Sequence, residues 1–103
     1  MSLRLPQGGA GKRLQTGLDT LDYEMAEEMA VSLGRAGERV VRALAAYQAV
    51  RDDGDARAPA LKAAAQAVHA YFIQRELCGL RRHDDAIRHY SIPREVLARL
   101  GAS

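Results

Sequence analysis

The residues best suited to chemistry lie between His69 and Leu100, a segment that holds all three histidines and the single cysteine of the chain. Asp85 and His89 are four residues apart and would share one face of a helix, where a carboxylate could ligate a metal beside an imidazole. His83 lies six residues from His89 and off that face, and no HxxxH or CxxC pair completes a ligand set. We therefore expect no metal site, and we interpret His83, Asp85 and His89 as a polar cluster on a short helix.

Cys78 is the other residue of this segment with a possible chemical role. Its thiol could act as a nucleophile only if nearby cations such as Arg75, Arg81 or Arg82 stabilised the thiolate. No histidine and acid accompany it in a recognisable catalytic order, and free cysteine is among the most frequently buried residue types. The sequence therefore predicts a non-enzymatic protein with no catalytic residue, no cofactor and no cofactor-binding residue.

A glycine-rich stretch, Gly8-Gly9-Ala10-Gly11-Lys12, has the composition of a phosphate-binding loop. The Walker pattern requires a glycine where this chain has Pro6, and a serine or threonine where it has Arg13. We therefore reject a phosphate loop. Because the prolines and glycines of this region disfavour a helix, we predict that residues 1–15 form a flexible or docking N-terminal arm.

Arginines gather toward the C-terminus, where two short predicted helices follow a longer one. This order permits a helix-turn-helix interpretation in which residues 93–100 form the recognition helix. Acidic residues interrupt the basic surface, however, and the chain has no asparagine to hydrogen-bond base edges. A small nucleic-acid-binding regulator is therefore the alternative function and not the favoured one. Its contacts would come from Arg81, Arg82, Arg88, Arg94 and Arg99.

Composition narrows the class of protein. A chain of 103 residues suits one domain with a modest core, and 48% hydrophobic with 27% charged residues is typical of a globular chain. No apolar run reaches the ~20 residues that span a bilayer, so we expect no membrane partner. A lone cysteine without a secretory signal favours a cytoplasmic protein. The formal net charge of +2 neither requires nor excludes nucleic acid.

The elements that would position these residues are helices. Apolar residues recur at steps of three and four from Leu18 to Val50, which predicts one long helix over residues 16–51. Thr16 and Asp19 are close to a capping box at its start, and the acidic turn of residues 52–55 ends it. At 1.5 Å per residue this helix would be roughly 50 Å long, more than a short hairpin can cover.

Three shorter helices are predicted to follow. The second covers about residues 59–78, because Pro59 suits a first helical position and Cys78-Gly79 a helix end. Short helices over about 83–89 and 93–100 come next, with Tyr71, Phe72 and Tyr90 holding them against the hairpin. The predicted stripe of the second helix consists of Leu61, Ala65, Val68 and Phe72, continued by Ile73, Leu77 and Leu80. The predicted fold is all-α: a long helical hairpin (16–51 against 59–78) plus two short C-terminal helices, forming one domain over residues 16–103.

Charge is divided unevenly along the long predicted helix. Its first half is acidic, at Asp19, Asp22, Glu24, Glu27 and Glu28, and its second half is mainly basic, at Arg35, Arg39, Arg42 and Arg51. This polarity complements the helix dipole, which is sufficient to explain it. The same polarity would also pair two copies of the helix antiparallel to each other.

Two glycines near the middle of this helix, Gly34 and Gly37, each cost roughly 1 kcal/mol relative to alanine, so close backbone approach is expected there. The approaching helix is either a second copy or the alanine-rich second helix of the same chain. The predicted self-association surface comprises Ala26, Ala30, Gly34, Gly37 and Val41. The favoured function is a non-enzymatic helical module that forms a homodimer and contacts other proteins.

Overall fold

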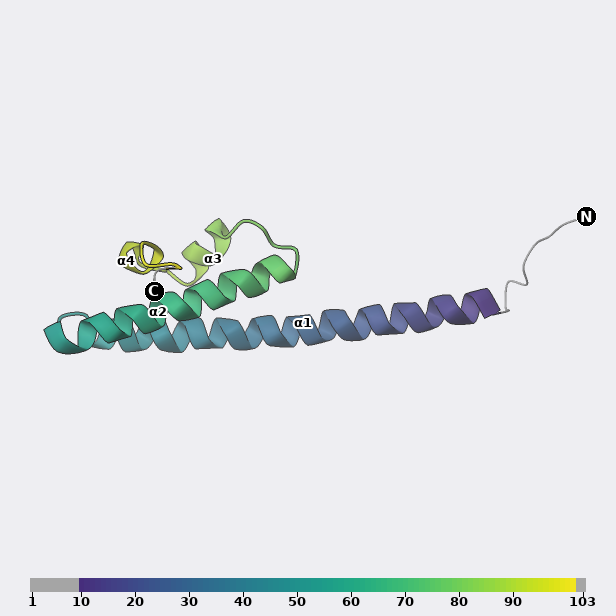
Figure 1. The fold of residues 1–103 in the computed structure, drawn as a ribbon, viewed down its shortest axis with the longest axis horizontal. Helices are drawn as coiled ribbons and strands as arrows, with labels where there is room; N and C mark the ends of the chain where they lie inside the picture. The colour runs from purple at the N-terminus through teal and green to yellow at the C-terminus, as the bar shows by residue number, and fades with distance from the viewer. Residues whose placement is uncertain (1–9, 102–103) are drawn as a thin grey trace, which may run out of the picture. The chain divides into compact units, whose positions relative to one another are not determined.

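The computed structural model describes the backbone of residues 10–101, together with the exposure of Gly17 and the side chains of residues 19–101. Four helices form this part of the chain: α1 (Ala10–Ala49), α2 (Gly54–Leu77), α3 (Asp84–His89) and α4 (Arg94–Leu97) (Figure 1). Residues 10–101 contain no strand. The predicted all-α hairpin with two short C-terminal helices is confirmed.

Helix α1 begins six residues earlier than predicted, at Ala10, so Thr16 is an interior residue and not a cap. Residues 10–15 of the predicted arm are helical, whereas residues 1–9 lie outside the described part of the chain. The prediction gave Gly11 too much weight. A single glycine costs about 1 kcal/mol, and the lysine, arginine, leucine and glutamine beside it are good helix formers.

Helix α2 also begins earlier than predicted, because its cap is Asp53 and not a residue beside Pro59. The Asp53 carboxylate accepts hydrogen bonds from the backbone N–H groups of Asp55 and Ala56, at 3.1 and 3.2 Å. These bonds satisfy donors that a helix start leaves unpaired. Pro59 consequently lies inside the helix, in its second turn.

The predicted end of α2 is confirmed. Cys78 is the C-cap, and Gly79 has a φ of 90°, the left-handed conformation that glycine adopts without steric cost. The Leu80 N–H donates to the Arg75 carbonyl at 2.9 Å, which closes a Schellman-type end. The chain therefore leaves α2 at Gly79 and turns back toward α3.

Helix α4 is shorter than the predicted 93–100. Pro93 is its N-cap, and beyond Leu97 the N–H groups of Arg99 and Leu100 bond to carbonyls three residues back. This tighter winding is typical of short helix ends. Gly101 follows with a φ of 72°.

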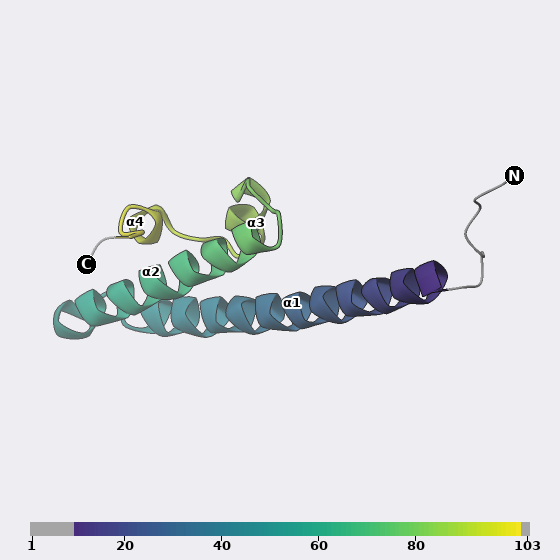
Figure 2. The same cartoon turned by 45° about the vertical axis from the view of Figure 1, so that its right-hand side comes forward.

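The chain divides into two units, one up to Val31 and one from Ser32 onward. In the second unit, α2 lies alongside residues 32–49 of α1, and α3 and α4 lie beside α2 (Figures 1 and 2). Their side chains form one core. Its buried members are Ala36, Val40, Leu44 and Tyr47 from α1, Leu61, Ala64, Ala65, Val68, Tyr71 and Phe72 from α2, and Ala86, Ile92 and Val96 from the C-terminal segment.

Aromatic side chains join the short helices to α2, as predicted. The rings of Tyr71 and Tyr90 meet edge to face with centroids 5.4 Å apart. Tyr71 and Phe72 are both buried. The predicted continuation of the α2 stripe through Ile73, Leu77 and Leu80 is wrong, because all three side chains are exposed.

None of the helices in residues 10–101 combines the length and the hydropathy that a membrane span requires.

Candidate functional site

The part of α1 up to Val31 presents only exposed side chains, as far as the structure describes them: Gly17 and residues 19–31. Large apolar side chains are among them, and that of Tyr23 is 72% exposed. In proteins, a helix gains most of its stability by packing its apolar face against other elements. The large exposed apolar residues of this part are Leu21, Tyr23, Met25, Met29 and Val31.

The structure separates the two glycines of the predicted self-association surface. A Cβ added to Gly34 would have no atom within 4 Å, whereas one added to Gly37 would lie 2.6 Å from the Tyr90 hydroxyl and 3.6 Å from the Tyr71 ring. Gly37 is buried within its own chain, against tyrosines of α2 and of the segment after α3. The other members, Ala26, Ala30, Gly34 and Val41, are all exposed.

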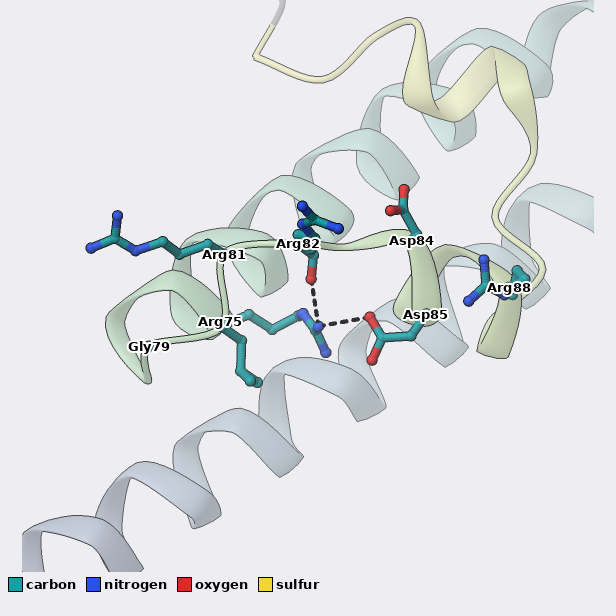
Figure 3. A pocket seen from close by; sticks show the side chains of 8 residues that line it. Arg75, Gly79, Arg81, Arg82, Asp84, Asp85 and Arg88 are labelled. Carbon is teal, nitrogen blue, oxygen red and sulfur yellow. Dashed lines mark hydrogen bonds and ion pairs between the residues drawn. The ribbon is translucent and has the colours of Figure 1, made fainter.

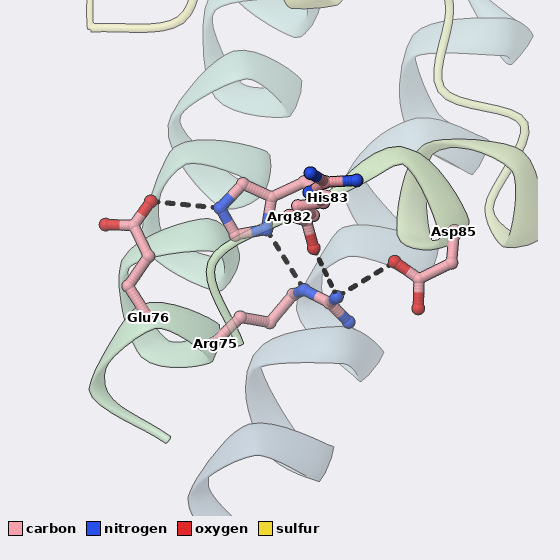
Figure 4. A network of polar contacts seen from close by, with 5 residues as sticks. All are labelled: Arg75, Glu76, Arg82, His83 and Asp85. Atoms are coloured by element: carbon pink, nitrogen blue, oxygen red, sulfur yellow. Dashed lines mark hydrogen bonds and ion pairs between the residues drawn. The ribbon is translucent and has the colours of Figure 1, made fainter. Parts of the chain in front are cut away.

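Arg75, which is 7% exposed, is the centre of a network of polar contacts among the described residues (Figure 4). Its Nε donates to His83 Nδ1 at 3.1 Å, and its Nη2 donates to the Arg82 carbonyl at 2.9 Å and to Asp85 Oδ1 at 3.0 Å. The guanidinium also lies 5.8 Å from the Tyr71 ring centroid, within cation–π range. Arg75 therefore ties the end of α2 to the following loop and to α3.

These contacts determine the tautomer of His83. Because Arg75 Nε can only donate, Nδ1 of His83 must accept, which places the ring proton on Nε2. Nε2 then donates to Glu76 Oε2 at 2.9 Å. The ring stacks on Phe72, with centroids 4.2 Å apart and an interplanar angle of 3°. Both nitrogens and one face of His83 thus serve packing within the chain.

The predicted polar cluster is brought together only in part. Arg75 links His83 and Asp85, whereas His89 is exposed and contacts the Tyr90 ring edge to face at 4.7 Å. Among the residues whose side chains are described, no group of three or more His, Cys, Asp or Glu residues is placed to hold a metal ion.

Sequence reasoning overlooked Arg75 as the centre of this cluster, although a signal was present. The predicted stripe of α2 runs in steps of four, three and four from Leu61 to Phe72, and the next step of three falls on Arg75. An arginine at the end of an apolar stripe indicates a buried charge, which proteins retain only with partners. Asp85 and His83 are those partners.

An open hollow of about 590 Å³ lies beside this network (Figure 3). Arg81 extends away from the other arginines of its wall. Arg81, Arg82 and Arg88 are exposed, and no ion pair joins them to another described residue. The residues that line the hollow are Arg75, Gly79, Leu80, Arg81, Arg82, Asp84, Asp85 and Arg88.

A second polar cluster connects the helices at the α1–α2 turn. The fully buried Tyr47 donates its hydroxyl to Glu95 Oε2 at 2.7 Å and accepts from Arg57 Nη2 at 3.2 Å. Arg51 Nη2 lies 3.1 Å from the same Glu95 oxygen. The hydrogen bond to Glu95, together with burial, raises the pKa of Tyr47. The same bond and the nearby arginines lower the pKa of Glu95.

The remaining residues considered for chemistry are dispersed. Cys78 is a free, half-buried thiol at the C-cap of α2. His69 is exposed on the same helix. Neither residue belongs to the Arg75 network.

These features define a small all-helical domain in which buried polar clusters connect the helices. The chain belongs to DUF6665, a family of unknown function whose model matches residues 3–103. No curated protein and no solved structure matches the chain.

Proposed function

We propose that this chain is a non-enzymatic interaction module that associates with a second copy of itself through α1. The observation that carries the proposal is the group of exposed large apolar side chains between Leu21 and Val31. Tyr23 lies on the side of the helix that carries Ala26, Ala30 and Gly34, and Val31 borders that side. Exposed apolar surface is a common mark of a protein–protein contact. Burial against a partner would stabilise each such side chain by roughly 25 cal/mol per Å² removed from water.

The small residues of α1 would let the backbone of a second copy approach closely at Gly34. Ala26, Ala30 and Gly34 follow one another at helical spacing, and Val41 lies two turns further along the same side. All four are exposed, and the space around Gly34 is open. Small residues let two helix backbones approach closely, which would offset the cost of a glycine inside a helix.

Charge supports a second copy as the partner. Residues 19–28 carry five exposed acids and no base, and the described structure contains no ion pair from any of them. The spacing of Glu24 and Arg42 in the sequence equals about five turns of a continuous helix. An antiparallel pair centred next to Gly34 would place Glu24 of each copy beside Arg42 of the other.

The first test is the solution mass of the native chain and of Gly34→Leu, measured by light scattering. We expect a native dimer and a folded monomeric variant, because leucine would keep the two backbones apart. Ala46→Leu is the matched control, since Ala46 is exposed on another side of α1 and should leave the dimer intact. A native monomer, or a Gly34→Leu dimer of unchanged strength, would overturn the proposal.

Charge reversal tests the antiparallel arrangement. Glu24→Arg and Arg42→Glu should each weaken the homodimer about tenfold or more, since each replaces two attractive pairs with two repulsive ones. An equimolar mixture should recover a heterodimer of native strength, because both pairs are again complementary. Failure to recover would exclude this pairing.

Exposed arginines support nucleic-acid binding as the second candidate. However, α4 spans four residues, which is short for a recognition helix. Titration with duplex DNA at two salt concentrations tests this function, because sequence-independent binding to phosphates weakens steeply with salt. The five arginines of this candidate, all exposed, are Arg81, Arg82, Arg88, Arg94 and Arg99.

A further inference from the structure

The hollow beside Arg75 carries an excess of positive charge (Figure 3). Arg75 and Asp85 form an ion pair at 3.0 Å and neutralise each other. The other charged side chains of the wall are Arg82 and Arg88, one acid, Asp84, and Arg81, which extends away from the other arginines. Like charges that share a hollow repel one another, and an anion placed among them relieves that repulsion.

Arg75 gives the hollow a rigid donor. Hydrogen bonds from Nε and Nη2 hold the guanidinium in one orientation. Among the described residues, these hydrogen bonds use Nε and Nη2 of Arg75 and not Nη1. Arg75 lines the hollow, so Nη1 is a donor available to a ligand there. A donor held in place in advance loses little entropy when it binds a ligand.

We propose that this hollow binds the phosphate group of a small organic phosphate. Arginine is the residue best suited to phosphate, because its planar fork donates two parallel hydrogen bonds to the oxygens. The volume of about 590 Å³ is in the range of small-molecule sites. Leu80, which is 43% exposed and lines the same hollow, offers an apolar contact to the organic part.

The test begins with calorimetric titration of the full chain with phenyl phosphate and with inorganic phosphate. We expect phenyl phosphate to bind more tightly, because its ring would contact Leu80. Leu80→Ser should remove most of that preference. Leu77→Ser is the matched control, because Leu77 is exposed and lies outside the hollow.

Charge substitutions locate the anion. Arg82→Gln with Arg88→Gln should weaken phenyl phosphate binding about tenfold for each arginine removed. Arg94→Gln with Arg99→Gln changes the net charge equally, at exposed positions outside the hollow, and should have little effect.

Asp84 provides a test of opposite sign. Since its carboxylate would repel a bound phosphate, Asp84→Asn should tighten binding about threefold. Asp52→Asn makes the same charge change at an exposed turn outside the hollow and serves as its control. A tightening shared by both variants would indicate a general charge effect and overturn the proposal.

Further outcomes would also refute the proposed site. One is the absence of phenyl phosphate binding at millimolar concentration, and another is an equal loss in the two double-arginine variants. A third refuting outcome is tight binding of duplex DNA that depends equally on the arginines of both double variants. Such binding would show a dispersed basic surface and not a confined site. Selective loss in Arg82→Gln with Arg88→Gln, with tightening in Asp84→Asn, is the supporting result.

Discussion

Gly34 and Gly37 lie one turn apart in α1, and the same substitution should have opposite effects at the two positions. Replacing either glycine with alanine inside a helix gains about 1 kcal/mol of intrinsic helix propensity. At Gly34 the added methyl group meets no atom of its own chain within 4 Å, so the full gain is expected for the monomer. At Gly37 the methyl group would lie 2.6 Å from the Tyr90 hydroxyl, well inside van der Waals contact.

The Tyr90 hydroxyl has little freedom to move away. Its ring is half-buried and packs edge to face against Tyr71 at 5.4 Å and against His89 at 4.7 Å. Overpacking of this kind costs about 1–3 kcal/mol. The sum for Gly37→Ala is a net loss of about 1 kcal/mol, whereas Gly34→Ala gains about 1 kcal/mol, so the variants should differ by about 2 kcal/mol.

Urea denaturation followed by far-ultraviolet circular dichroism measures both changes, at a single protein concentration low enough to keep every variant monomeric. Tyr90→Phe supplies the control, because it removes the clashing oxygen and leaves the ring carbon at an ordinary distance of 3.6 Å. In that background Gly37→Ala should become stabilising. Equal stabilisation by the two alanine variants in the native background would refute the packing of Tyr90 on Gly37.

Three further predictions concern the core and the polar clusters. Val68→Ala should lower the free energy of unfolding by about 2 kcal/mol, because the Val68 side chain is fully buried. Leu77→Ala, at an exposed site, should change it by less than about 0.5 kcal/mol. Equal losses in urea denaturation would contradict the burial of Val68 in the core. Arg75→Met should cost about 2 kcal/mol through its lost hydrogen bonds, and a loss below about 0.5 kcal/mol in the same assay would show that the network contributes little. The hydrogen bond from Tyr47 lowers the pKa of Glu95 below its ordinary value of 4.5. The ionised carboxylate therefore stabilises the fold above pH 4.5, and this stabilisation is lost as the pH falls through the lowered pKa. Glu95→Gln should therefore flatten the acid side of the pH–stability curve, and an unchanged curve would argue against the contact.

The helical periodicity of the sequence was enough to predict the hairpin, because helix formation depends on neighbours three and four residues apart. The same local signals located the acidic turn after α1 and the stop at Gly79. The predicted starts of α1 and α2 were wrong because two local signals competed there. Gly11 and Pro59 disfavour a helix, but good helix formers and the Asp53 cap outweighed them.

The candidate site was less predictable. His83 and Asp85 were singled out from the sequence, but the residue that joins them, Arg75, was overlooked. Its role depends on the left-handed turn at Gly79, which returns the chain so that the loop and α3 meet the end of α2. Spacing along one helix carries no information about such a return.

The sequence by itself therefore determined the all-helical class, the order of the helices and the uneven division of charge along α1, because each depends on residues close together in the chain. The tertiary structure alone decided that Gly37 is buried while Gly34 is open, and that Arg75 is buried while Leu77 is exposed. The physical reason is that burial depends on which distant side chains arrive at a position. Tyr90 reaches Gly37, and Asp85 reaches Arg75, only after α3 has folded back on α2.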